Sequence, residues 1–151
     1  EAPRETSGKR VLVVGAGPSG LSAAYHLRRL GHDVEIREAG PLAGGMMRFG
    51  IPQYRLPRAV LDAEVGRITG MGVVLTLNTK VEDLRATMAE DGFDAAFLAV
   101  GAHIGKRAYI PAGESAHIMD AVSLLRSMEG GRRCSSASAR FSVTGTSEAP
   151  R

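Results

Sequence analysis

Residues 11–20 read VLVVGAGPSG, a short apolar run that leads directly into a glycine-rich turn. The uninterrupted run from Val11 to Val14 is typical of a strand that is covered on both faces. From Pro18 onward the apolar residues recur at helical spacing, and proline is well placed in the first turn of a helix. A strand, a G-x-G-x-x-G turn and a helix in this order are typical of a dinucleotide-binding α/β fold.

Beyond this turn, helical and strand patterns alternate along the chain. Strands separated by helices require right-handed crossovers, which place the strands side by side in a parallel sheet. The predicted fold class is therefore α/β with a Rossmann-like parallel sheet of the FAD/NAD(P)-binding type. Helices are predicted over residues 18–30, 57–69, 82–90 and 117–128, and further strands over residues 32–38, 73–77 and 94–100. The glycine-rich loop 39–56 is too long to be an idle connection, so it is a second candidate for contact with a ligand.

Each glycine of the turn has a separate predicted role. Gly15 allows the tight turn, Gly17 lets the backbone approach a pyrophosphate, and Gly20 lets the helix pack closely on the sheet. The helix N-terminus offers free N–H groups and the positive end of a dipole to the phosphates. The remaining residues of this candidate phosphate site are Ala16, Pro18 and Ser19.

Glu38 ends the second predicted strand, at the distance from the turn where dinucleotide-binding folds carry an acidic residue. Its carboxylate can accept hydrogen bonds from both hydroxyls of an adenosine ribose and would repel a 2′-phosphate. The predicted ligand is therefore FAD or NAD rather than NADP. The turn and Glu38 alone leave FAD and NAD both open.

Composition excludes several other classes of protein. The 151 residues carry a net charge of only +3 and are 5% aromatic, so no nucleic-acid partner is predicted. A single cysteine, Cys134, rules out an internal disulfide, and the four histidines are scattered, so no metal site is predicted. No apolar run is long enough to span a bilayer. No serine lies in a sequence motif typical of a catalytic nucleophile. A cytoplasmic location and no catalytic side chain are therefore predicted.

The composition also predicts three segments. Residues 1–9 form a polar N-terminal arm, residues 10–129 form the Rossmann-like domain, and residues 130–151 hold few large apolar residues. A segment of that kind cannot bury enough surface to order itself, so the last segment is predicted to be a disordered tail.

Three further stretches carry a family resemblance: GGMMRFGIPQYRLP at 44–57, FDAAFLAVG at 93–101 and IPAGE at 110–114. With the glycine turn, they resemble the flavin domain of glutamate synthase small subunits. Dihydropyrimidine dehydrogenase and related ferredoxin-linked oxidoreductases share this domain. The resemblance covers about residues 9–128.

The resemblance implies FAD as the cofactor, with NAD as the second choice. FAD would be held by the glycine turn and by the stretch from Glu38 to Met46, in which Gly44 and Gly45 are included. Arg55 would lie near the flavin and Val81 near the adenine; the alternative for Arg55 is a solvated surface position. Gly101, at the end of its matched stretch, completes the candidate cofactor-binding residues.

The family also implies partners that this sequence does not encode. Its members carry a cysteine-rich iron–sulfur segment and a second glycine turn for NADPH, and neither occurs here. The fold is thus expected to be incomplete relative to the family. Two functions remain open: the FAD-binding portion of an NAD(P)H-dependent oxidoreductase that relays electrons through FAD to iron–sulfur partners, or a non-catalytic module that binds FAD or NAD.

Overall fold

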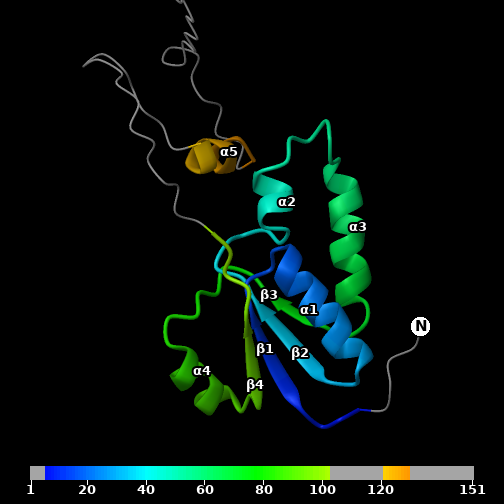
Figure 1. Cartoon of the computed structure of the whole chain (residues 1–151), viewed down its shortest axis with the longest axis vertical. Coiled ribbons are helices and arrows are strands. Elements are labelled where there is room, and N and C mark those ends of the chain that lie inside the picture. The colour runs from blue at the N-terminus through cyan, green and yellow to red at the C-terminus, as the bar shows by residue number, and fades with distance from the viewer. Residues whose placement is uncertain (1–5, 103–120, 130–151) are drawn as a thin grey trace, which may run out of the picture.

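A computed structural model of the chain describes residues 6–102 and 121–129, and its centre is a parallel sheet (Figure 1). Strands β1 (Arg10–Val14), β2 (Asp33–Arg37), β3 (Val74–Thr76) and β4 (Ala95–Leu98) lie in the order β3-β2-β1-β4. All neighbouring strands are parallel. The helices are α1 (Pro18–Arg29), α2 (Met46–Phe49), α3 (Arg58–Thr69), α4 (Leu84–Asp91) and α5 (Ala121–Glu129). The predicted α/β fold class is confirmed.

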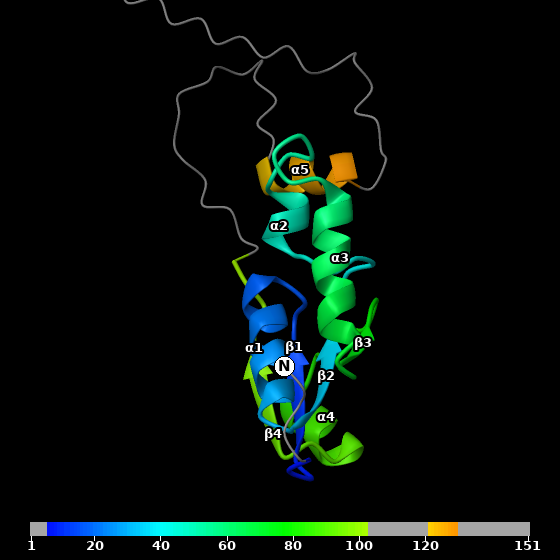
Figure 2. The same ribbon diagram turned by 90° about the vertical axis from the view of Figure 1, so that its right-hand side faces the viewer.

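The apolar run of β1 supplies both faces of the core, because successive side chains of a strand point to opposite sides. Val13 packs with Ile36 of β2 under α1 and α3. Leu12 packs with Phe93 on the opposite face, against α4. Figures 1 and 2 show α1 and α3 on one side of the sheet and α4 on the other. A strand covered in this way needs the continuous apolar sequence from which it was predicted.

Several boundaries differ from those predicted. β1 begins one residue earlier than predicted, and the other three strands are shorter than predicted by two or three residues, because their ladders end where the chain turns into its loops. The loop 39–56 contains the single turn α2, which was not predicted. It follows Gly44 and Gly45, whose φ angles of 116° and 49° bend the chain sharply in a conformation that favours glycine. The start of the helix predicted over 117–128, the first residues of the predicted arm and the predicted tail 130–151 lie outside the described residues.

Within residues 6–102 and 121–129, none of the helices has the length and apolar character needed to cross a bilayer. The same part of the chain holds no group of three or more His, Cys, Asp or Glu side chains placed to bind a metal ion. Cys134 lies outside it.

Asp94 joins the start of β4 to the start of β1. Its carboxylate accepts hydrogen bonds of 2.8 Å each from Lys9 Nζ and from the Arg10 backbone N–H. The hydrogen bond from the Lys9 ammonium has the larger effect and the one from the Arg10 N–H the smaller, and together they lower the pKa of Asp94 below its ordinary value.

We therefore expect the pair of Lys9 and Asp94 to stabilise the fold above the unfolded-state pKa of Asp94, and this stabilisation to be lost as pH falls through the lower folded-state pKa. An NMR titration of Asp94 at or above the ordinary value would contradict this, and Lys9→Ala should move the titration upward.

Candidate dinucleotide-binding site

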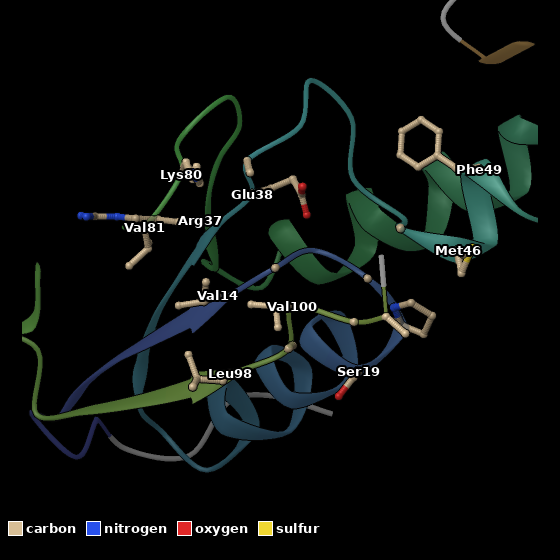
Figure 3. A pocket seen from close by; sticks show the side chains of 18 of the residues that line it. Val14, Ser19, Arg37, Glu38, Met46, Phe49, Lys80, Val81, Leu98 and Val100 are labelled. Carbon is tan, nitrogen blue, oxygen red and sulfur yellow. The ribbon is translucent and has the colours of Figure 1, made fainter. Parts of the chain in front are cut away.

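A pocket of about 550 Å³ opens at the carboxyl ends of β1, β2 and β4 (Figure 3). This is the edge of a parallel sheet at which dinucleotides bind, beside the N-terminus of the first helix. Nine of the residues predicted from the sequence line it: Gly15, Gly17, Pro18, Ser19, Glu38, Gly45, Met46, Val81 and Gly101.

Two glycines of the turn are required by the packing of the protein itself. Gly15 has a φ of +105°, and a Cβ there would lie 2.5 Å from the Ala99 carbonyl oxygen on the loop after β4. A Cβ on Gly20 would overlap the carbonyl oxygen of Gly15. Gly15 therefore lets the turn approach the loop after β4, and Gly20 lets α1 approach the turn, which fits the tight turn predicted at Gly15 and the close packing predicted at Gly20.

Gly17 differs from these two glycines. Its φ of −77° and ψ of −176° suit any residue. A Cβ there would meet no atom closer than the Gly45 Cα at 3.9 Å. Nothing in the described chain thus requires glycine at this position, although Gly17 lines the pocket. The first intrahelical bond runs from the Leu21 N–H to the Gly17 carbonyl, at 2.9 Å, so earlier N–H groups of the helix are available to an anion.

Glu38 makes two hydrogen bonds that the sequence did not indicate. Its Oε2 accepts from the Ala16 N–H at 2.8 Å, and its Oε1 accepts from the Gly40 N–H at 2.9 Å. The half-buried carboxylate therefore fixes the end of β2 to the glycine turn (Figure 3). Because each carboxylate oxygen can accept more than one hydrogen bond, both retain capacity for ribose hydroxyls.

Arg37 also lines the pocket, but its charge is directed elsewhere. Its guanidinium lies 2.7 Å from Glu35 and 2.7 Å from Asp91. The hydrogen bond to Glu35, which exceeds the effect of burial, raises the pKa of Arg37. Figure 3 shows this side chain extending away from the Glu38 carboxylate. Within residues 6–102 and 121–129, the ion pairs of Arg37 are therefore with Glu35 and Asp91 and not with Glu38.

Val81 is placed beside Glu38 by the loop between β3 and α4. Backbone bonds join this loop to the end of β2: the Thr79 N–H donates to the Glu38 carbonyl at 2.8 Å, and the Asn78 N–H donates to the Gly40 carbonyl at 3.0 Å. Val81 packs with the apolar cluster on the α4 side of the sheet. This gives the pocket an apolar wall next to the predicted ribose position, where an adenine could pack.

The loop that carries the family resemblance forms the opposite wall. The Gly44 N–H donates to the Ala16 carbonyl at 2.8 Å, and a Cβ on Gly45 would lie only 2.8 Å from the Gly17 Cα. The two glycine segments therefore touch, and α2 begins directly after them. Figure 3 shows Met46 and Phe49 of α2 across the turn from Glu38 and Val81.

Four predicted residues do not line the pocket: Ala16, Gly20, Gly44 and Arg55. The first three lie behind the lining and support the shape of the pocket through the backbone hydrogen bonds and the close packing described above. Arg55 is exposed on the loop before α3. Its flavin contact stays a prediction from the resemblance.

The pocket also contains residues that sequence reasoning missed. Most adjoin predicted positions in the strands and loops, so inclusion of the flanking residues would have found them. Phe49 lies within the loop 39–56 that the sequence indicated as a candidate for ligand contact, whereas Arg126 carried no signal, because it reaches the pocket through the placement of α5. Ala39 belongs to the stretch from Glu38 to Met46 that the resemblance assigned to FAD. The other lining residues not named individually from the sequence are Val14, Arg37, Phe49, Thr79, Lys80, Leu98, Ala99, Val100, Ala102 and Arg126.

The fold and the pocket define a dinucleotide-binding Rossmann-like domain. Residues 13–66 match the family described as NAD(P)-binding Rossmann-like domain. The chain is 48% identical over 108 residues to the NADP(+)-dependent formate dehydrogenase subunit beta of Moorella thermoacetica, covering 71% of this chain and 15% of that protein. It is 41% identical over 124 residues to the NAD-dependent dihydropyrimidine dehydrogenase subunit PreT of Salmonella typhimurium, covering 81% of this chain and 29% of that protein.

A third relative is the glutamate synthase [NADPH] small chain of Bacillus subtilis, 35% identical over 101 residues, which are 66% of this chain and 20% of that protein. The resemblance to glutamate synthase small subunits and dihydropyrimidine dehydrogenase is thus confirmed. The chain spans between 15% and 29% of the length of these curated relatives. A solved structure of 2-naphthoyl-CoA reductase with 2-naphthoyl-CoA has a TM-score of 0.68 and 27% identity, covering 84% of this chain and 19% of that one.

Proposed function

We propose that this chain binds FAD and is the FAD-binding portion of an NAD(P)H-dependent flavin oxidoreductase. The observation that carries the proposal is a glycine at position 17 that the packing of the protein does not require. The protein packs tightly against Gly15 and Gly20, whereas a Cβ on Gly17 would make only an ordinary contact with the Gly45 Cα at 3.9 Å. A glycine that the fold does not need, at a helix N-terminus in a pocket, fits the close approach of a pyrophosphate.

The loop after Gly44 favours FAD over NAD. It belongs to the stretch that resembles flavin domains, and it forms a wall of the pocket with Met46 and Phe49. Apolar and aromatic side chains with few polar groups are typical of surfaces that bind a planar ring. In this arrangement Glu38 binds the adenosine ribose, Val81 packs against the adenine, and the α2 side receives the flavin.

Bound FAD would supply a ring system that accepts a hydride from a nicotinamide and returns the electrons to another centre. The chain's own residues would bind and orient this cofactor. Glu38 would exclude a 2′-phosphate by charge, and the helix N-terminus would compensate the charge of the pyrophosphate. The names of the relatives, which describe subunits of NADP(+)-dependent and NAD-dependent dehydrogenases, support NAD(P)H and a further subunit as partners. An iron–sulfur domain or subunit as that partner is proposed from the family resemblance alone.

Titration of the purified chain with FAD tests the proposal. The chain has no tryptophan, so a change in flavin fluorescence reports binding without interference from a tryptophan. We expect saturable binding of FAD at one site per chain, with competition by ADP. Binding of NAD+ with no binding of FAD would overturn the proposal.

The second candidate function is a non-catalytic module that binds FAD or NAD. The match of residues 13–66 to an NAD(P)-binding domain favours it. Addition of NADPH or NADH to the FAD-loaded chain with its partner subunit separates the two functions. An oxidoreductase would reduce the flavin and bleach its absorption band near ~450 nm, whereas a non-catalytic module would leave that band unchanged.

A further inference from the structure

Helix α5 is joined to the body of the domain by a half-buried ion pair. Arg58 at the start of α3 donates from Nε to Glu129 Oε1 at 2.7 Å and from Nη2 to Glu129 Oε2 at 2.9 Å. Such a two-point pair fixes orientation as well as distance. Arg58 also donates to the carbonyls of Ile51 and Leu56 at 3.1 Å each, so one arginine joins α5 to the end of the loop 39–56.

Arg48 of α2 adds a second positive charge beside Glu129. Its side chain is only 7% exposed, and its Nη1 lies 3.9 Å from Glu129 Oε1. Arg48 also donates to the Ala43 carbonyl and pairs with Asp62 of α3. Glu129 thus lies between two arginines that would otherwise repel each other. This arrangement holds α5 against α2 and ties its last residue to the start of α3 (Figure 2).

This placement brings a residue of α5 to the pocket. Arg126 lines it, and its guanidinium lies 5.9 Å from the centre of the Phe49 ring. The other basic residues that line the pocket, Arg37 and Lys80, come from the Glu38 side of the glycine turn. Arg126 therefore supplies positive charge at the end of the pocket where α2 lies.

We propose that Arg126 binds the second nucleotide of the cofactor, the half beyond the pyrophosphate, and that Glu129 is the positioning residue that holds Arg126 there. This inference rests on the proposed function. A dinucleotide with its ribose at Glu38 and its pyrophosphate at Gly17 must direct its other half across the turn, toward Met46, Phe49 and α5. The guanidinium can donate hydrogen bonds to carbonyl or phosphate oxygens and can stack on a planar ring.

The test compares FAD with ADP, which contains only the half of the cofactor assigned to the Glu38 side. Calorimetric titration of the full chain measures both dissociation constants. For Arg126→Ala and for Glu129→Gln we expect FAD affinity to fall by about tenfold, with ADP affinity unchanged. In the double variant, Glu129→Gln should add little to the loss caused by Arg126→Ala, because both remove the same contact.

Two matched variants control for unrelated effects. Met128→Ala truncates an exposed neighbour on α5 that is not part of the pocket lining. Glu64→Gln removes an exposed ion pair with Arg67 within α3. Both should leave FAD and ADP affinities unchanged, whereas Arg126→Lys should recover part of the FAD affinity by restoring the charge.

The outcomes separate this inference from the proposed function. If the wild-type chain binds both probes but Arg126→Ala leaves FAD affinity unchanged, the inference is overturned and the proposed function stands. If FAD and ADP affinities fall together in Arg126→Ala, α5 acts on the whole fold and the inference is also overturned. If the wild-type chain binds neither probe, the proposed function fails and the inference fails with it.

Discussion

Gly17→Val is expected to reduce FAD affinity by at least about a hundredfold while leaving the melting temperature of the protein unchanged. The φ and ψ of Gly17 lie in extended space that valine adopts readily, and a Cβ has room there. The valine methyl groups would then occupy the space in front of the helix N-terminus. Pyrophosphate could no longer reach those N–H groups, so the charge-assisted hydrogen bonds would be lost.

Thermal unfolding and FAD titration of the same variant check both halves of this prediction. Gly20→Ala is the matched control from the same turn, because its new Cβ would overlap the Gly15 carbonyl oxygen. That variant should lose stability first and FAD affinity as a consequence. If Gly17→Val binds FAD as the wild type does, the pyrophosphate does not lie at this turn and the assignment of the pocket is wrong.

The fold was predictable because its signals are local. The apolar run of β1, the helix stop near Gly31 and the repeat of Leu61, Val65 and Ile68 each lie within a few residues, and the alternation of elements restricts the topology. The one-turn helix α2 was not predictable in this way. It depends on two adjacent glycines with positive φ and on a backbone bond from Gly44 to Ala16.

The site was predictable to a different extent at its two ends. The glycine turn and Glu38 are close in sequence to the elements that position them, so their spacing was informative. Arg126 reaches the pocket on a helix that is held by contacts distant in sequence, among them the pair of Glu129 with Arg58, 71 positions earlier in the chain. No periodicity or motif reports such a contact, and neither acidic nor basic residues at a helix end are unusual in themselves.

Glu38→Ala is expected to reduce both the stability of the fold and the affinity for the cofactor. The carboxylate accepts hydrogen bonds from backbone N–H groups and, in the proposed function, from the ribose hydroxyls as well. Its loss leaves the N–H of Ala16 without its partner in a residue that is fully buried. An unpaired buried N–H costs about 1–3 kcal/mol, and each 1 kcal/mol lowers the melting temperature by roughly 4 °C in a domain the size of residues 10–129. FAD affinity should fall by about tenfold or more as the ribose acceptor is lost.

Glu38→Gln separates the two roles of the side chain. The amide oxygen can still accept one backbone N–H, so the loss of stability should be smaller than in Glu38→Ala. The negative charge disappears, which removes the repulsion of a 2′-phosphate, and the affinity for NADP+ relative to NAD+ should rise. Melting curves and calorimetric titrations with FAD, NAD+ and NADP+ measure these effects, with Glu64→Ala on α3 as the control for loss of a surface carboxylate. A lower melting temperature with unchanged FAD affinity in these variants would show that Glu38 stabilises the fold and does not bind the ribose. That result would leave the ribose without an acceptor and would move the cofactor away from β2.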